Sequence, residues 1–118
     1  MSLIKVYHNS RCSKSNQALA YLKDKGINDE QMNVVRYLDE PISKDVATEL
    51  VNLLQDDLEA LIRRADAKKL GIDVPKSLTK DWVIEHIVSE PKIMQRPIVV
   101  KDKKAIVARP TELIDSIL

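Results

Sequence analysis

The chain has a single cysteine, Cys12, and the residue types around it suit nucleophilic chemistry. Arg11 and Lys14 place positive charge beside it, and Ser13 and Ser15 offer hydroxyl groups. The nucleophile is the thiolate, and nearby cations or a helix N-terminus lower the pKa of a cysteine below its usual value. A lone cysteine is more often a small buried apolar residue, but Cys12 is flanked by Arg11 and Ser13 rather than by aliphatic residues. We therefore expect Cys12 to be a solvent-reachable thiolate at the start of a helix.

The cysteine count also constrains any redox cycle. A thiol that is oxidised and reduced in turn needs a second sulfur to form a disulfide. Ser15 stands where a Cys-x-x-Cys pair would place that second sulfur. If Cys12 is redox-active, the resolving thiol must come from outside, from glutathione or from another protein. One cysteine without a disulfide partner also favours a reducing, cytoplasmic location.

Three arginines are candidates for holding an anionic substrate of Cys12. Arg96 and Arg109 each precede a proline on the two strands of a predicted hairpin, so closure of the hairpin brings both to the same end of the sheet. Arg63 is expected to close a helix. Guanidinium groups bind tetrahedral oxyanions through two hydrogen bonds, although an ordinary surface role is the simpler interpretation of any single arginine. Pro97 opens a strand, which makes it either a cis-proline candidate or a plain edge proline.

Other site types find little support. His8 lies close enough in sequence to tune Cys12, whereas His86 is interpreted as a helix surface residue, and two distant histidines do not make a metal site. The formal net charge of +1 does not favour nucleic acid or an anionic membrane surface. The sequence contains neither an apolar run of about 20 residues, as a membrane helix needs, nor a secretory leader at its start.

The hydrophobic pattern predicts one α/β domain over residues 1–118, since 118 residues with 44% hydrophobic content suit one core. The predicted strands are Leu3–Tyr7, Val34–Leu38, Pro97–Lys101 and Ala105–Ala108. The first predicted helix is Cys12–Lys25, and the last runs from Pro110 to Leu118. Four helical segments are predicted between them. They are a helix capped by Ser43 that carries Val46 to Leu54, a helix from Asp56 to Arg64, a short piece ending at Leu70, and a helix capped by Thr79 that reaches Val88. This order, β-α-β, a helical block and then β-β-α, is thioredoxin-like: a mixed four-stranded sheet with flanking helices and a central helical insertion over approximately residues 43–90.

The motifs then resemble a known family. Tyr7-His8-Asn9-x-x-Cys12-x-x-Ser15 resembles the active-site loop of the ArsC-type arsenate reductases, the glutaredoxin- and glutathione-dependent class. Later segments match the family in order: Leu61-Ile62-Arg63, Leu70-Gly71, Arg96-Pro97-Ile98-Val99-Val100 and Arg109-Pro110-x-Glu112. The resemblance covers essentially the whole chain. It departs at Asn16, where family members often carry arginine, and at Ser10, where proline is common.

The resemblance implies a thioredoxin-like fold and an enzyme that reduces arsenate, or a similar oxyanion, without a metal or a bound cofactor. It implies that glutathione is the co-substrate and that the partner glutaredoxin reduces the resulting mixed disulfide. It also favours a cis bond before Pro97. The site residues that it implies are the nucleophile Cys12, His8 as a group that lowers the pKa of that cysteine, Arg63, Arg96 and Arg109 as oxyanion ligands, and Asn9 and Ser15 as supports of the loop.

Two other functions remain open from the sequence. The first is a non-enzymatic regulator resembling the Spx proteins, which share the fold and bind RNA polymerase; those usually carry a Cys-x-x-Cys switch, and Ser15 argues against it. The second is a thiol enzyme acting on another substrate, such as glutathione mixed disulfides. In that enzyme Cys12 stays essential while the three arginines are dispensable.

Overall fold

The computed structural model describes residues 3–118, which form two compact units. The first unit combines the chain up to residue 40 with residues 96–118, and the second holds residues 41–95. The segment predicted as a helical insertion, residues 43–90, lies within the second unit.

The first unit is built on a four-stranded mixed sheet in the order β2-β1-β3-β4. Its strands are β1 (Ile4–Tyr7), β2 (Met32–Val35), β3 (Ile98–Lys101) and β4 (Lys104–Val107). Strand β1 runs parallel to β2 and antiparallel to β3, which in turn pairs antiparallel with β4. The α-helix α1 (Ser13–Asp24) connects the two parallel strands. The predicted thioredoxin-like sheet is thus confirmed.

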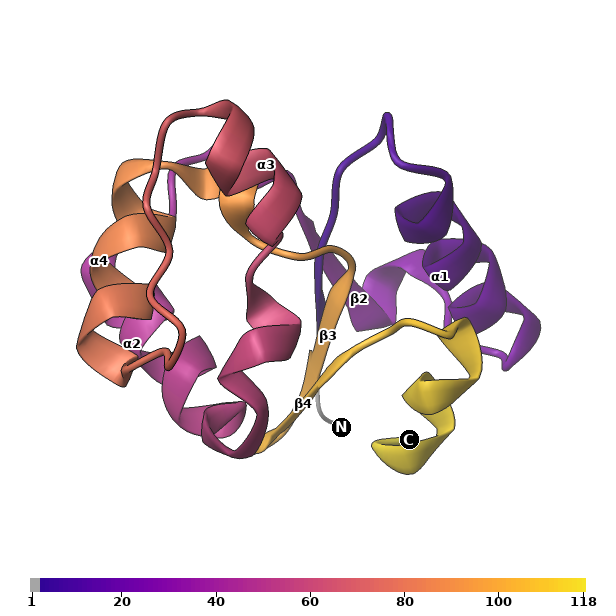
Figure 1. The fold of residues 1–118 in the computed structure, drawn as a ribbon. Helices are drawn as coiled ribbons and strands as arrows, with labels where there is room; N and C mark the ends of the chain where they lie inside the picture. The colour runs from indigo at the N-terminus through magenta and orange to yellow at the C-terminus, as the bar shows by residue number, and fades with distance from the viewer. Residues whose placement is uncertain (1–2) are drawn as a thin grey trace. The chain divides into compact units, whose positions relative to one another are not determined.

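One apolar core holds this unit together. Residues alternate between the two faces of a strand, and residues three or four apart share a face of a helix, so β1 and α1 can each present an apolar stripe. The 3-10 segment η4 (Thr111–Ser116) completes the layer, and Figure 1 shows this yellow segment beside the indigo α1. The buried members of the core are Ile4, Val6, Ala18, Leu22, Met32, Val99, Ala108, Ile114 and Ile117.

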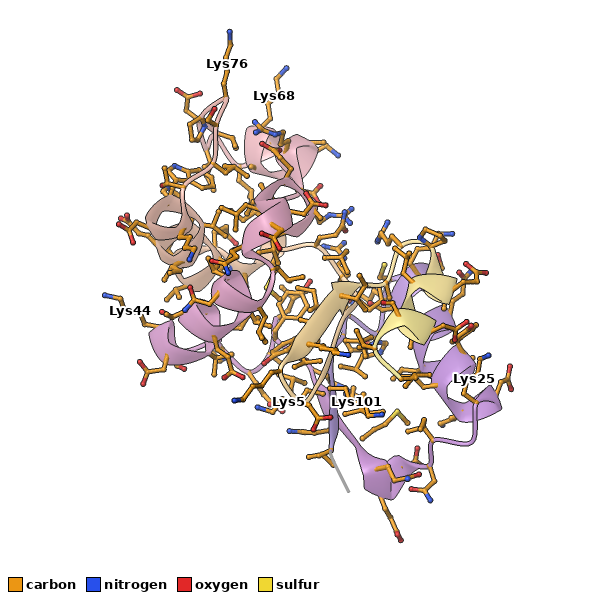
Figure 2. The ribbon with its side chains drawn as sticks, turned by 90° about the horizontal axis from the view of Figure 1, so that it is seen from below. Lys5, Lys25, Lys44, Lys68, Lys76 and Lys101 are labelled. Atoms are coloured by element: carbon orange, nitrogen blue, oxygen red, sulfur yellow. The ribbon has the colours of Figure 1, made fainter. Side chains whose placement is uncertain are left out.

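The far end of α1 is closed by a glycine and tied to η4 by a charge pair. Gly26 follows the helix with a φ of +89°, a conformation that residues with a Cβ rarely adopt. The ammonium group of Lys25, labelled in Figure 2, lies 3.5 Å from a carboxylate oxygen of Asp115 and 5.2 Å from the ring centre of Tyr21. The Asp115 charge raises the pKa of Lys25.

The second unit is helical. It contains α2 (Lys44–Leu53), η2 (Gln55–Leu61), α3 (Arg64–Lys69), α4 (Lys80–Ser89) and η3 (Pro91–Ile93). The two predicted caps are confirmed: the hydroxyl of Ser43 accepts the N–H of Val46, and that of Thr79 accepts the N–H of Trp82, both at 3.2 Å. Helices α2 and α4 pack on each other, and their buried residues are Ala47, Leu50, Val51, Val83 and Ile87.

The second strand lies earlier in the chain than the sequence predicts. It spans Met32–Val35 instead of Val34–Leu38. It follows directly on the 3-10 turn η1 (Asp29–Gln31). It ends because the carbonyl of Arg36 accepts the N–H groups of Asp39 and Glu40, which closes a turn.

Arg63 does not close a helix, as the sequence predicts, but lies at the N-cap position of α3. The segment before it ends at Leu61 because Ile62 forms a β-bridge with Met94, supported by the Arg63 N–H to Ile93 carbonyl bond of 2.7 Å. The last predicted helix is also different. It is a 3-10 segment, and Pro110 precedes it in an extended conformation.

Candidate active site at Cys12

The strand register collects the predicted site residues of the first unit at one edge of the sheet. Tyr7 at the end of β1 lies opposite Val35 on one side and Ile98 on the other, and Ile98 lies opposite Val107. The loop after β1, the residues before β3 and the residues after β4 therefore leave the sheet at the same edge. The first carries Cys12, the second Arg96 and the third Arg109.

The loop between β1 and α1 is held by its own polar groups. The N–H of Cys12 donates to the carbonyl of Asn9 at 3.0 Å, and the side-chain oxygen of Asn9 accepts the N–H of Arg11 at the same distance. The N–H of Asn9 donates to the hydroxyl of Ser15 at 3.3 Å. Ser15 is fully buried, so its hydroxyl serves the loop rather than solvent. Asn9 and Ser15, predicted as loop supports, are thus bonded to each other.

Asn16 contributes a contact that the sequence analysis missed. Its side-chain amide donates to the carbonyl of Ser10 at 3.0 Å. In the sequence these two positions stand out only as departures from the family pattern. Their pairing across six residues was the missed signal, because a side-chain amide in the first turn of a helix can reach back to the preceding loop.

Cys12 occupies the N-cap position of α1 with an extended backbone and a partly exposed side chain. Partial burial acts to raise the pKa of its thiol, but the N–H of Ser15, the Arg96 guanidinium, the N–H of Lys14 and the charge of Arg109 together lower the pKa from 9.0 to about 7. These groups stabilise the thiolate because helix N-terminal N–H groups and cations both favour negative charge. The lowered pKa increases the share of Cys12 side chains that are ionised near pH 7.

Arg109 contacts the nucleophile directly. Its Nη2 donates to the Sγ of Cys12 at 3.4 Å, and its Nε donates to the carbonyl oxygen of Arg96 at 2.7 Å. The predicted proximity of Arg96 and Arg109 is thus found, and the Arg96 carbonyl helps to aim the Arg109 guanidinium at the sulfur. The peptide bond before Pro97 is cis, and the bond before Pro110, which the sequence analysis did not single out, is cis as well.

His8 is the first residue after β1 and is 4% exposed. Its N–H donates to the carbonyl of Val35 at 2.8 Å, and within residues 3–118 its Nδ1 atom has no hydrogen-bond partner. Burial, and secondly the charge of Arg36, lower the pKa of His8. Both effects favour the neutral imidazole over one that brings a positive charge to the Cys12 thiolate. A part for His8 in the chemistry stays a prediction.

Arg63 belongs to the second unit and is engaged within it. Its Nε contacts a carboxylate oxygen of Asp66, and its Nη1 donates to the side-chain oxygen of Gln95 at 2.7 Å. This pairing partly neutralises the guanidinium that the sequence analysis assigns to the oxyanion. The role of Arg63 stays a prediction.

Two absences apply to the part of the chain that the structure describes. In residues 3–118 no group of three or more histidine, cysteine, aspartate or glutamate residues is arranged to hold a metal ion. None of the helices in that same range is both long and apolar enough to cross a bilayer.

The arrangement at Cys12 suits attack on a tetrahedral oxyanion. A thiolate, a guanidinium bonded to it and a second arginine converge on the N-terminus of a helix, where backbone N–H groups favour an anion. Such a site can bind an oxyanion and present its central atom to sulfur. A buried, inert cysteine would show neither the lowered pKa nor the cationic contact.

Comparisons with known proteins agree with this geometry. Residues 7–117 match the model of the ArsC family. The chain is 39% identical, over the full length of both, to the arsenate reductase of Neisseria meningitidis serogroup A, and 38% identical to the uncharacterized protein YfgD of Escherichia coli K12, covering 92% of this chain and 91% of that one. Among solved structures, the arsenate reductase from Vibrio cholerae is similar with a TM-score of 0.80, at 30% identity over 99% of this chain and 98% of that one. The chain belongs to the ArsC family.

Proposed function

We propose that this chain reduces arsenate to arsenite through Cys12, with glutathione and then glutaredoxin as external reductants. Relatives named arsenate reductase match its whole length at up to 39% identity. The observation that carries the proposal is the 3.4 Å contact between the Arg109 guanidinium and the Sγ of Cys12, whose pKa is about 7. It supplies an ionised nucleophile and an anion-binding group at one point. The chain's single cysteine fits work in a reducing compartment such as the cytoplasm.

The first step is a substitution at arsenic. The Cys12 thiolate attacks arsenic, the S–As bond forms, and an As–O bond breaks as that oxygen leaves as water after taking up protons. Arg109 and Arg96 are assigned to bind the arsenate oxygens, and the N–H groups of Lys14 and Ser15 face the sulfur. Arsenic stays in the +5 state, so this step involves no oxidation or reduction.

The second step is the reduction. The sulfur of glutathione attacks the sulfur of Cys12, the S–S bond forms, and the S–As bond breaks with its electron pair passing to arsenic. Arsenic becomes +3 and leaves as arsenite, while the two sulfurs are oxidised to a mixed disulfide. A glutaredoxin thiol then takes up the glutathione moiety by thiol–disulfide exchange, which returns Cys12 as a thiolate.

The decisive experiment measures arsenite formed from arsenate with glutathione and glutaredoxin present. The wild type forms arsenite catalytically, and Cys12→Ser forms none above the enzyme-free rate. Ser13→Ala, which changes an exposed hydroxyl next to the nucleophile, is the matched control and keeps activity. A wild type that forms no arsenite, or a Cys12→Ser variant that does, overturns the proposal.

The arginines separate this function from a thiol enzyme that acts on disulfides alone. Arg96→Lys and Arg109→Lys keep a positive charge but lose the planar fork, so the KM for arsenate rises by about tenfold or more. Exchange of Cys12 with a neutral disulfide is affected much less. Arg63→Lys tests the third predicted oxyanion ligand in the same assay. Equal loss with both substrates would assign the arginines to the thiolate instead of the oxyanion.

A further inference from the structure

Arg36 lies at the same sheet edge as the Cys12 loop, on the side away from Arg96 and Arg109. It is the first residue after β2, and the carbonyl of the preceding Val35 accepts the N–H of His8 at 2.8 Å. In the sheet order β2-β1-β3-β4, β1 and its loop are central. The oxyanion arginines flank the loop from the β3 and β4 side, and Arg36 flanks it from the β2 side.

The Arg36 guanidinium has no partner among the residues that the structure describes. Across residues 3–118 it makes no hydrogen bond and no ion pair, and the side chain is exposed. Its backbone is fixed all the same, because its carbonyl accepts the N–H groups of Asp39 and Glu40. Arg64, by contrast, makes a two-bond contact with the carboxylate of Glu59 at 2.9 and 2.6 Å. Arg36 thus offers a fork for a carboxylate that the described chain does not supply.

A second observation links Arg36 to the reactive loop. His8 is 4% exposed, and its Nδ1 atom has no partner within residues 3–118. The charge of Arg36 acts on this imidazole and contributes to lowering its pKa. An anion bound to Arg36 would therefore change the pKa of His8, the residue at which the Cys12 loop begins.

We propose that Arg36 binds a carboxylate of the low-molecular-weight thiol that attacks the Cys12 adduct. The inference rests on the proposed function and assigns a binding residue to its second step. The chain has one cysteine, so its reductant is an external thiol. Arg96 and Arg109 are occupied by the oxyanion at that moment, and a thiol bearing carboxylates needs a separate cation. Glutathione fits this chemistry, because it carries a carboxylate at each end and a thiol between them.

The kinetic test compares two thiols. Arg36→Gln raises the KM for glutathione about fivefold, the range of an exposed charge pair, and leaves the KM for arsenate unchanged. The rate with 2-mercaptoethanol, which has no carboxylate, does not change. The matched control is Lys103→Gln, which removes an exposed cation from the β3–β4 turn, beyond Lys101 (Figure 2). Equal effects of Arg36→Gln on both thiols, or none on glutathione, overturn the inference, as does an effect confined to the glutaredoxin step.

A binding test needs no turnover. S-methylglutathione, which lacks a free thiol, is added to the protein while the His8 ring is titrated by NMR, with His86→Gln used to assign the signals. In the wild type the ligand raises the pKa of His8, because the bound carboxylate cancels the Arg36 charge. In Arg36→Gln the pKa of His8 is already higher and the ligand does not move it. No response in the wild type overturns the carboxylate site.

The two tests fail separately from the proposed function. If the wild type forms no arsenite but S-methylglutathione shifts His8 through Arg36, arsenate reduction is wrong and the thiol site stands. If arsenite forms and the ligand leaves His8 unchanged, the reaction stands and the thiol site is wrong.

Discussion

Three of the described α-helices, α1 in the first unit and α2 and α4 in the second, begin with chemically similar side chains that have different roles. In the second unit, α2 and α4 start at Ser43 and Thr79, whose hydroxyls accept a backbone N–H of the first turn. In the first unit, α1 starts at Cys12, and the sulfur makes no such cap hydrogen bond. The N–H groups of Lys14 and Ser15 instead lower the pKa of the thiol.

The difference shows how one helix position serves either stability or reactivity. A hydroxyl cap satisfies a donor that would otherwise lack a partner and stabilises the helix by about 1 kcal/mol. A thiol is a weak acceptor until it ionises, so the α1 donors act on Cys12 mainly through its charge. The N-terminal N–H groups that bind the cap hydroxyls of α2 and α4 thus correspond to the groups that stabilise the Cys12 thiolate on α1.

The sharpest way to break the comparison is to give α1 the hydroxyl start of α2 and α4. Cys12→Ser loses arsenite formation entirely. At pH 6 the Cys12 thiol is mostly protonated. There the free energy of unfolding of the variant equals that of the wild type or exceeds it by about 0.5–1 kcal/mol, because serine caps a helix better than a protonated cysteine does. Urea denaturation measures this. A loss of more than about 1 kcal/mol would mean that Cys12 also carries packing that serine cannot replace.

Removing the cation next to the sulfur has the next largest effect. Arg109→Gln raises the pKa of Cys12 above its value of about 7, so the thiolate fraction at pH 7 drops. The rate of alkylation by iodoacetamide falls by the same factor at pH 7 and approaches the wild-type rate above pH 9. Arg64→Gln, which breaks the ion pair with Glu59 in the second unit, is the control and leaves the curve in place. An unchanged midpoint in Arg109→Gln would assign the low pKa to Arg96 and the helix N-terminal N–H groups without Arg109.

For substitutions at the helix caps of the second unit we expect the opposite result, a loss of stability without a change in the reactivity of Cys12. Thr79→Ala removes the hydroxyl that accepts the Trp82 N–H and lowers the free energy of unfolding by about 1 kcal/mol. The alkylation rate of Cys12 stays the same, because the thiolate is held by groups of the first unit. Ser43→Ala repeats the experiment at α2. A changed alkylation rate in either variant would show that cap and nucleophile are coupled.

The smallest effect is a pH dependence of stability. The pKa of Cys12 is about 7 in the folded protein against 9.0 for an unperturbed cysteine. A lowered pKa means that folding favours the thiolate, so the wild type gains stability over Cys12→Ser as the pH rises from 7 to 9, and loses it as the pH falls through 7. Because the sulfur is partly exposed, the gain is under about 1 kcal/mol. A constant difference between the two proteins over this range contradicts it.

Much of the fold follows from sequence patterns, and the predictions that are wrong have physical causes. Strand β1 and the caps at Ser43 and Thr79 follow from short-range rules. The pattern places the second strand too late because its apolar residues continue through Tyr37, which is buried although it lies in a turn. The same pattern predicts Arg36 in the middle of a strand, whereas the structure has it directly after the end of β2.

Part of the candidate site was predictable from the sequence, and the contacts between its residues were less so. Cys12 and the Arg96–Arg109 pair follow from motif and hairpin geometry. The bond from Arg109 to the Cys12 sulfur joins residues 97 positions apart and depends on side-chain rotamers, which sequence spacing does not determine. Likewise, the pairing of Arg63 with Asp66 and Gln95 depends on how the chain turns after Ile62.

The solitary cysteine has a practical consequence. A chain with two cysteines can return to an internal disulfide that looks the same whatever reduced it. Here each turnover that stops halfway leaves the reductant's own atoms on Cys12 as a mass tag. The mass of the intact protein, trapped with acid during the reaction, therefore identifies the thiol that serves it, and a sample taken from growing cells would report which thiol those cells provide.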